Sequence, residues 1–480
     1  MIGQVSTAMD SIKKFFRSMR LTKKPVVLPK PELSLELYEI PLPGPSQIFK
    51  LTVDCFDEIF DYLSLTELHS FAQTCLAMQR IAGAYFIENY KSTKTICDKY
   101  GIHTEYSYNE DGTLVYPSIK STAFNPYITI ITREFNPIKP LRLFQSHSHE
   151  FTSLNHIYLN SNVLDTAKIK CLETILPQLE VIKLLNCSVE GDVYDMLLKF
   201  CVNLKKFFVQ DDNSAQYPIV KKQTNSWLLR EYPLLEMIQL IQRDPFRINE
   251  LTTFLEMNPT IRTFSISSGY LWKNRQELLE SNAKLEKLEI HDYYGNLSSL
   301  QELCSFLNQL HERGFFKRLH IFDFYLDEDD YRQLASLEAF SVKYFNVDYL
   351  SHLTQLKELL IWKDENDLEI EMELLAKGLV NLRTVFIDNA LLDDVLQFIR
   401  HSVSVNKIRV EFDKGQGALD LKRLNDERKR LVGACKVAIY VTTDIFLSTK
   451  WAAKNGDLNL WFVEIRRADW YGWDHYYDMI

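Results

Sequence analysis

Residues that could bind a metal ion or perform catalysis are few and isolated in this chain. His147, His149 and Glu150 lie close together and are of the types that bind zinc. No further histidine or cysteine cluster stands at metal-ligand spacing, so a polar, solvated loop is the better interpretation. The acidic run at 327–330 is typical of a helix start, where carboxylates interact favourably with the helix dipole.

Sequence motifs of catalysis are also absent. The chain has no G-x-S-x-G nucleophile turn, no G-x-x-x-x-G-K phosphate loop, no H-E-x-x-H zinc motif and no glycine-rich dinucleotide turn. Only 15 of the 480 residues are glycine, which leaves few for loops that cradle phosphates. We therefore expect no enzymatic activity, no cofactor and no metal ion.

The composition predicts a folded, acidic body. Hydrophobic residues make up 46% of the chain, enough for a large core, and the formal net charge is −9. Because the first 30 residues are basic, the remainder is more acidic still, which argues against a nucleic-acid partner. The eight cysteines form no C-x-x-C pair, and we expect reduced, mostly buried thiols.

Two N-terminal segments precede the apolar body. Residues 1–24 are basic, and positions 9–20 have the spacing of a short amphipathic helix. This helix could contact an anionic membrane, the one membrane contact that we expect, or it could be a frayed terminus. Residues 25–47 contain six prolines and predict an extended linker. A long apolar run and a secretory signal are both missing, so we expect a cytoplasmic or nuclear protein.

Residues 48–90 have a dense helical periodicity and predict about three short helices. Ser64 or Thr66 would cap the second helix, with Glu67 in its first turn. The simplest interpretation is a helical cap on the domain that follows, because the apolar face of an amphipathic helix is more often buried in the core of its own protein than at an interface with a partner.

The run L-T-V-D-C-F-D-E-I-F-D-Y-L-S-L-T-E-L from Leu51, followed by T-C-L-A-M-Q-R-I-A, resembles the F-box. Thr52 and Met78 stand where the family has a proline and a tryptophan. The matching or near-matching positions are Leu51, Asp54, Phe56, Ile59, Phe60, Tyr62, Leu63, Leu68, Cys75, Ile81 and Ala82. The resemblance implies docking on the Skp adaptor, and so on the cullin scaffold, through Leu51, Asp54, Phe56, Ile59, Phe60 and Leu63.

The rest of the chain repeats a short apolar motif. An L-x-x-L-x-L pattern, with any large aliphatic residue or Phe as anchor, recurs at intervals of about 25 residues, the length of a leucine-rich repeat. The anchors are Leu154/Ile157/Leu159, Leu179/Ile182/Leu184, Leu204/Phe207/Val209, Leu235/Ile238/Leu240, Ile261/Phe264/Ile266, Leu285/Leu288/Ile290, Phe316/Leu319/Ile321, Leu337/Phe340/Val342, Leu356/Leu359/Ile361, Leu382/Val385/Ile387 and Val405/Ile408/Val410. The set that begins at Leu337 is the weakest and could belong to a helix.

The predicted fold class is α/β: a small all-helical F-box-like module followed by a curved leucine-rich-repeat solenoid, with parallel strands inside and helices outside. The repeats span 151–415. Residues 91–150 form a connecting region in which a strand at 127–131 could open the solenoid. Residues 416–480 form terminal repeats and a cap, and the aromatic residues between Trp470 and Tyr477 either cap the last repeat or fold over the inner face.

Side chains that alternate with the anchors should line the inner, concave face of the solenoid. Basic and aromatic residues predominate among them and suit an acidic or phosphorylated segment of a partner, whereas a solvated face without preference is the alternative. The predicted substrate-binding residues are Lys183, Lys206, Phe208, His291, Arg318, His320, Trp362, Phe386 and Arg409.

The whole pattern resembles an F-box and leucine-rich-repeat protein. The resemblance implies a non-catalytic substrate-recognition subunit of an SCF-type cullin-RING ubiquitin ligase, whose repeats bind an unidentified substrate protein. The alternative is a non-degradative repeat scaffold whose helices at 51–90 only cap the array, with membrane attachment through residues 9–20 as a third possibility. Burial of Phe56 and Phe60 against the repeats would favour the scaffold, and a separate lobe would favour the ligase subunit.

Overall fold

The structure is a computed structural model, and most of its repeat region is described. The described residues are 48, 51–90, 107–108, 114–115, 123–131, 148–160, 163–185, 187–189, 193–210, 226–241, 248–291, 300–326, 334–345, 347–363, 371–412, 415–453 and 460–468. The predicted basic segment 1–24, the proline-rich linker 25–47, the acidic run 327–330 and the aromatic tail 469–480 lie outside them.

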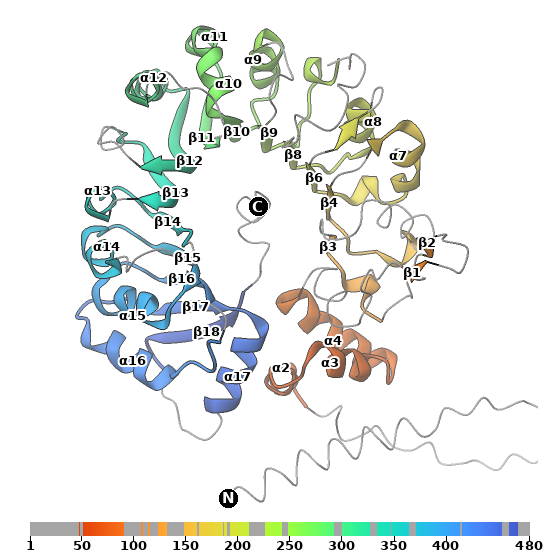
Figure 1. Ribbon diagram of the computed structural model, residues 1–480. Coiled ribbons are helices and arrows are strands. Elements are labelled where there is room, and N and C mark those ends of the chain that lie inside the picture. Colours follow the sequence, from red (N-terminus) through yellow and green to blue (C-terminus); the bar gives the residue numbers. More distant parts are fainter. Residues whose placement is uncertain are drawn as a thin grey trace, which may run out of the picture.

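One parallel sheet of 14 strands forms the inner wall of a ring (Figure 1). Its strands follow one another in chain order, and each pairs with the next in parallel. They are β3 (Ile130–Ile131), β4 (His156–Asn160), β6 (Val181–Leu185), β8 (Lys206–Gln210), β9 (Met237–Ile241), β10 (Thr263–Ser267), β11 (Leu285–His291), β12 (Phe316–Leu326), β13 (Leu337–Phe345), β14 (Glu358–Ile361), β15 (Thr384–Ala390), β16 (Lys407–Phe412), β17 (Val437–Val441) and β18 (Val463–Arg467).

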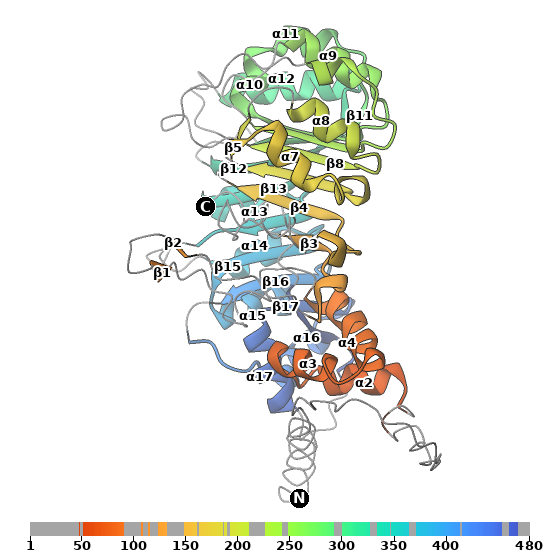
Figure 2. The same ribbon diagram turned by 90° about the vertical axis from the view of Figure 1, so that its right-hand side faces the viewer.

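Helices between the strands cover the outer side of the sheet, as both ribbon views show (Figure 2). They are η2 (Asn125–Tyr127), η3 (Ser148–Glu150), α7 (Thr166–Leu172), η4 (Leu176–Gln178), α8 (Val193–Phe200), η5 (Ser226–Leu229), α9 (Ile248–Met257), α10 (Ser268–Lys273), α11 (Arg275–Glu280), α12 (Leu300–Glu312), α13 (Val347–Ser351), α14 (Met372–Gly378), α15 (Leu392–His401), α16 (Leu421–Arg430) and α17 (Thr443–Ala453). Two small two-stranded sheets pair β1 (Ser107–Tyr108) with β2 (Leu114–Val115) and β5 (Val163–Leu164) with β7 (Ser188–Val189).

The predicted solenoid is confirmed as a parallel sheet backed by helices. Every predicted anchor is buried in the core between sheet and helices. The second and third anchors of each set lie in one strand, and the first anchor lies in that strand or two residues before it. The weakest set, at Leu337, Phe340 and Val342, lies in β13 and not in a helix. Beyond the predicted repeats, β17 and β18 continue the same sheet, and β3 begins it.

Three helices at the start of the described chain form what we call the helical module: α2 (Val53–Phe60), α3 (Leu65–Ala72) and α4 (Leu76–Asn89). Ser64, and not Thr66, begins the second helix: its hydroxyl accepts a hydrogen bond from the Glu67 amide, and the Glu67 carboxylate accepts one from the Ser64 amide. Phe56, Phe60, Phe71 and Tyr85 pack ring against ring in the module's interior.

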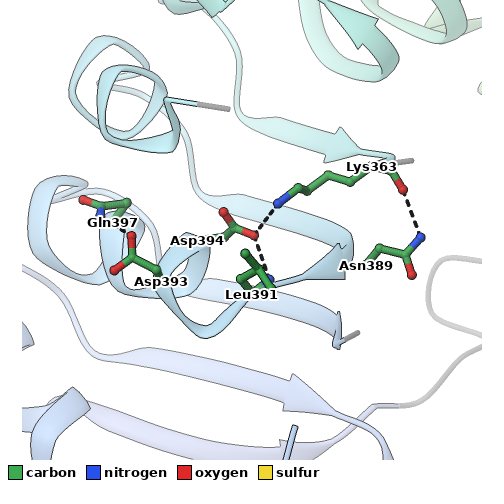
Figure 3. A network of polar contacts seen from close by, with 6 residues as sticks. All are labelled: Lys363, Asn389, Leu391, Asp393, Asp394 and Gln397. Atoms are coloured by element: carbon green, nitrogen blue, oxygen red, sulfur yellow. Dashed lines mark hydrogen bonds and ion pairs between the residues drawn. The ribbon is translucent and has the colours of Figure 1, made fainter. Parts of the chain in front are cut away.

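Side chains at the sheet edges join consecutive repeats. Figure 3 shows one such link, in which the Lys363 ammonium, after β14, contacts the Asp394 carboxylate in the first turn of α15 at 2.8 Å. The same carboxylate accepts a hydrogen bond from the Leu391 amide, and Asn389 donates its side-chain amide to the Lys363 carbonyl. Asn389 has a φ of 47°, a left-handed conformation that asparagine tolerates well. The link holds β14, β15 and α15 in register.

Arg428 of α16 is fully buried and binds only backbone and sulfur among the described residues. Burial lowers the pKa of its guanidinium. The group donates hydrogen bonds to the carbonyl oxygens of Ile399, Ser402, Val403, Val405 and Cys435. Ile399 lies in the last turn of α15 and Ser402 directly follows that helix, where the carbonyls have no partner within the helix. One side chain thus satisfies the end of a helix and the loop into the next strand.

Replacing Arg428 by methionine is expected to lower the free energy of unfolding by about 3 kcal/mol, because several buried carbonyls lose charge-assisted donors. Urea unfolding followed by circular dichroism measures the change. The matched control is Arg430→Met on the same helix, where the side chain is 74% exposed and the change should stay within about 0.5 kcal/mol. Equal effects of the two substitutions would contradict the role assigned to Arg428.

Candidate functional site: the inner face of the repeat sheet

The inner face of the ring is built from strand residues that alternate with the buried anchors. Successive side chains of a strand point to opposite faces, so the residues between the anchors face away from the helices. The pairing register sets these side chains in rows across the sheet. One row runs through Lys183, Phe208, Gln239, Ser265, Glu289 and His320.

Two apolar clusters lie on this face, separate from the main core. The larger one unites Phe322, Leu360, Trp362 and Phe386, and the smaller one unites Val181, Phe208 and Met237. The indole of Trp362 meets the ring of Phe386 edge to face and donates a hydrogen bond to the Ser341 hydroxyl at 2.9 Å. The inner face therefore has its own packed layer of side chains.

Lys183 shows how a cation is accommodated in that layer. It is 2% exposed, and its ammonium lies 5.2 Å from the centroid of the Tyr158 ring and 5.7 Å from that of Phe208. Aromatic faces attract a cation more strongly when water is excluded. Arg409 has a similar environment, with its guanidinium 6.0 Å from the Phe386 ring.

A buried acid lies at the centre of the inner face. Glu289 is 1% exposed, its carboxylate is 2.6 Å from the Lys287 ammonium, and the His320 ring nitrogen is 4.0 Å away. Burial alone would raise the pKa of Glu289, but the positive charges of Lys287 and His320 outweigh it and hold the pKa below its usual value. Glu289 is therefore ionised at neutral pH.

Three further carboxylates, on β14, β15 and β16, make this face less basic than predicted. Burial, and then the charge of Glu411, raise the pKa of Asp388 to about 6. Burial also raises the pKa of Glu358 on β14. Asp388 and Glu411 stand two residues beyond Phe386 and Arg409, so extending the alternation of those strands by one step would have found them.

All nine predicted substrate-binding residues lie on the inner side of the sheet, but burial divides them. Lys206 and Arg318 are exposed. The other seven are buried in the inner layer: Lys183, Phe208, His291, His320, Trp362, Phe386 and Arg409. A ligand that leaves this layer intact can therefore reach Lys206, Arg318 and the partly exposed Lys287.

The six residues that the F-box resemblance assigned to an adaptor lie on or next to α2. Leu51 and Asp54 are exposed, and Ile59 and Leu63 are partly buried. Phe56 is 3% and Phe60 0% exposed, because both lie in the interior of the helical module. Their burial is thus explained by packing within the module, and one continuous core cluster joins the module to the repeats.

The remaining residues considered for metal binding or catalysis form no such site among the described residues. The Glu150 carboxylate accepts a hydrogen bond from Asn125, and His147 lies outside the described residues. Within the described ranges no three histidine, cysteine or acidic side chains gather as a metal site would require. No helix in the described parts is both long and apolar enough to span a bilayer. Contrary to expectation, half of the described free thiols are exposed, those of Cys55, Cys75 and Cys435.

The raised pKa of Asp388 predicts a pH-dependent stability. A carboxyl whose pKa is higher in the folded protein favours folding below its unfolded pKa, and that contribution is lost as the pH rises through about 6. Asp388→Asn should therefore leave the thermal midpoint unchanged near pH 4 and raise it by roughly 1–3 °C near pH 7.5. Asp393→Asn, at an exposed position, is the control. A gain of equal size at both pH values would contradict the assignment.

Comparisons with known proteins add little to this architecture. No protein-family model matches the sequence, and no curated protein matches it significantly. Among solved structures the chain is similar to the leucine-rich repeat-containing protein LegL7 from Legionella pneumophila, with 16% identity over 65% of this chain and 92% of that chain. The TM-score is 0.32, too low to carry an argument. The repeat architecture therefore rests on the order of the strands and on their buried anchors.

Proposed function

We propose that this chain is the substrate-recognition subunit of an SCF-type cullin-RING ubiquitin ligase. The helical module would dock on the Skp adaptor, and the inner face would hold the substrate protein. The chain itself would catalyse nothing and would act in the cytoplasm or nucleus. It would raise the local concentration of a substrate lysine near the conjugating enzyme that the rest of the complex recruits.

The observation that carries the proposal is the union of two parts in one chain: helices with the spacing of an F-box and a repeat sheet with a chemically diverse inner face. In the module, Leu51 and Asp54 offer one apolar and one acidic group at the start of α2. Phe56 and Phe60, on the buried side of α2, hold that helix in place by ring contacts with each other and with Phe71. Adaptor docking would thus depend on Leu51, Asp54, Ile59 and Leu63.

At the inner face, the accessible cations Lys206, Arg318 and Lys287 support an acidic segment as the ligand. Lys287 already contacts Glu289, so Lys206 and Arg318 would make the stronger contribution. The carboxylates at Asp388 and Glu411 repel such a segment, which restricts it to the half of the ring around β8 to β12.

A non-degradative scaffold is the second candidate, and the continuity of the module's core with the repeats favours it. The burial of Phe56 and Phe60 favours neither candidate, because these rings pack within the module. The module is not a separate lobe, because its core is continuous with that of the repeats. In this function the helices would serve as part of the array, and the inner face alone would bind a partner.

Co-purification of the full chain with the Skp adaptor and cullin decides between the two candidates. The informative variant is Leu51→Asp with Asp54→Lys, because both positions are exposed and the module's core stays intact. The ligase proposal expects binding by the unaltered chain and at least about a tenfold weaker affinity of the variant.

The matched control is Val380→Asp, which changes an apolar side chain that is 62% exposed on a repeat far from α2. It should bind the adaptor like the unaltered chain. An unaltered chain that fails to bind would exclude the ligase function and favour the scaffold. Equal binding by chain and variant would show that the docking face lies elsewhere on the module.

A further inference from the structure

The helical module lies between the two ends of the repeat sheet (Figure 1). On the side of the first strand, close packing of aromatic rings is joined by hydrogen bonds. The ring of Tyr127 lies against the backbone of α4, since a Cβ at Gly83 would stand 2.4 Å from it. Phe86 stacks on Phe124 with centroids 4.6 Å apart, and the Gln79 side chain donates a hydrogen bond to the Ala123 carbonyl.

On the side of the last repeat the module makes contacts of another kind. The Lys450 ammonium of α17 lies 2.9 Å from the Asp61 carboxylate at the end of α2. The rings of Tyr62 and Trp451 meet edge to face at 5.1 Å. These contacts join residues nearly 400 positions apart in sequence and close the array into a ring.

Arg467 of β18 forms the deeper part of this contact. Its guanidinium lies 4.8 Å from the Tyr90 ring and 5.5 Å from the Tyr85 ring of α4, and 4.8 Å from Phe446 of α17. The residue is 6% exposed, and no oxygen of the described residues accepts a hydrogen bond from the guanidinium. Burying this cation removes its water of hydration, and the free-energy cost of that desolvation offsets part of its attraction to the three rings.

We propose that the helical module is a releasable clasp, and that the ring opens between the module and the last repeat. The first-strand side buries stacked rings against helix backbone, whereas the contacts described on the last-repeat side include an ion pair, a ring contact and a desolvated cation among three rings. Contacts of the second kind are weakened by salt and separate at lower cost.

Release would change the inner face, because each repeat of a solenoid contacts only its neighbours. Small rotations between repeats add up along such an array and alter its curvature. With the clasp closed, both ends are tied and the curvature is fixed. With it open, the inner face can widen and admit a longer or bulkier segment. The inference does not depend on adaptor binding by the module.

Hydrogen exchange of the full-length chain tests the clasp. Lys450→Glu places a carboxylate beside Asp61 and leaves the module unaltered. We expect amide exchange in 53–63 and 443–453 to rise by about fivefold or more, while exchange in 123–131 stays unchanged. Small-angle X-ray scattering of the same variant should show a larger radius of gyration. Lys450→Arg, which keeps the charge, should behave like the unaltered chain.

The matched control is Lys317→Glu, which breaks an exposed ion pair with Glu286 between neighbouring repeats and leaves the clasp alone. If Lys450→Glu exchanges like this control, or if exchange rises equally on both sides of the module, the proposal is wrong. If Lys450→Glu fails to fold, scattering by the unaltered chain at two salt concentrations tests the proposal instead. A radius of gyration that grows from about 0.05 M to 1 M salt supports release, and one that stays constant overturns it.

Discussion

Each strand of this protein needs the neighbouring repeats, as well as its own helix, to bury its apolar side chains, and the rest of the structure depends on that constraint. A single strand and its helix cannot form a core, so the repeats have to stack in register. The anchors of each repeat therefore meet those of the next in one continuous core. Stacking also leaves two unpaired ends. The helical module lies against both, and the same apolar core extends into it.

The same stacking determines the chemistry of the inner face. Neighbouring strands are about 4.8 Å apart, so every second side chain is forced beside its counterparts in the adjacent repeats. Acidic and basic side chains of neighbouring strands then meet, as Glu289 of β11 and His320 of β12 do, and cations lie over rings, as Lys183 does. Like charges are brought together too: burial raises the pKa of Asp388, and the charge of Glu411 on the next strand raises it further. The face is a packed layer with a few accessible cations, and its selectivity follows from which side chains that layer leaves exposed.

The repeat pattern was sufficient to locate every anchor and to assign the inner face, because burial and alternation are local consequences of the sequence. Other features depend on distant partners. Whether Lys206 is exposed and Lys183 buried is decided by rings on adjacent strands. The interior position of Phe60 depends on Phe71 and Tyr85, which the helical spacing alone cannot orient. The contact of Asp61 with Lys450 joins opposite ends of the chain, and no periodicity could indicate it.

The two candidate functions make different demands on the ring. A ligase subunit has to hold its substrate at a fixed position relative to the adaptor, because a substrate lysine must meet the loaded conjugating enzyme. A module tied to both ends of the array supplies that rigidity only while the Asp61 to Lys450 contact persists. A scaffold has no such requirement and would gain from an inner face that widens to fit several partners. The strength of the clasp therefore bears directly on function: a ring that stays closed suits the presentation of one substrate, and a ring that opens readily suits the accommodation of many.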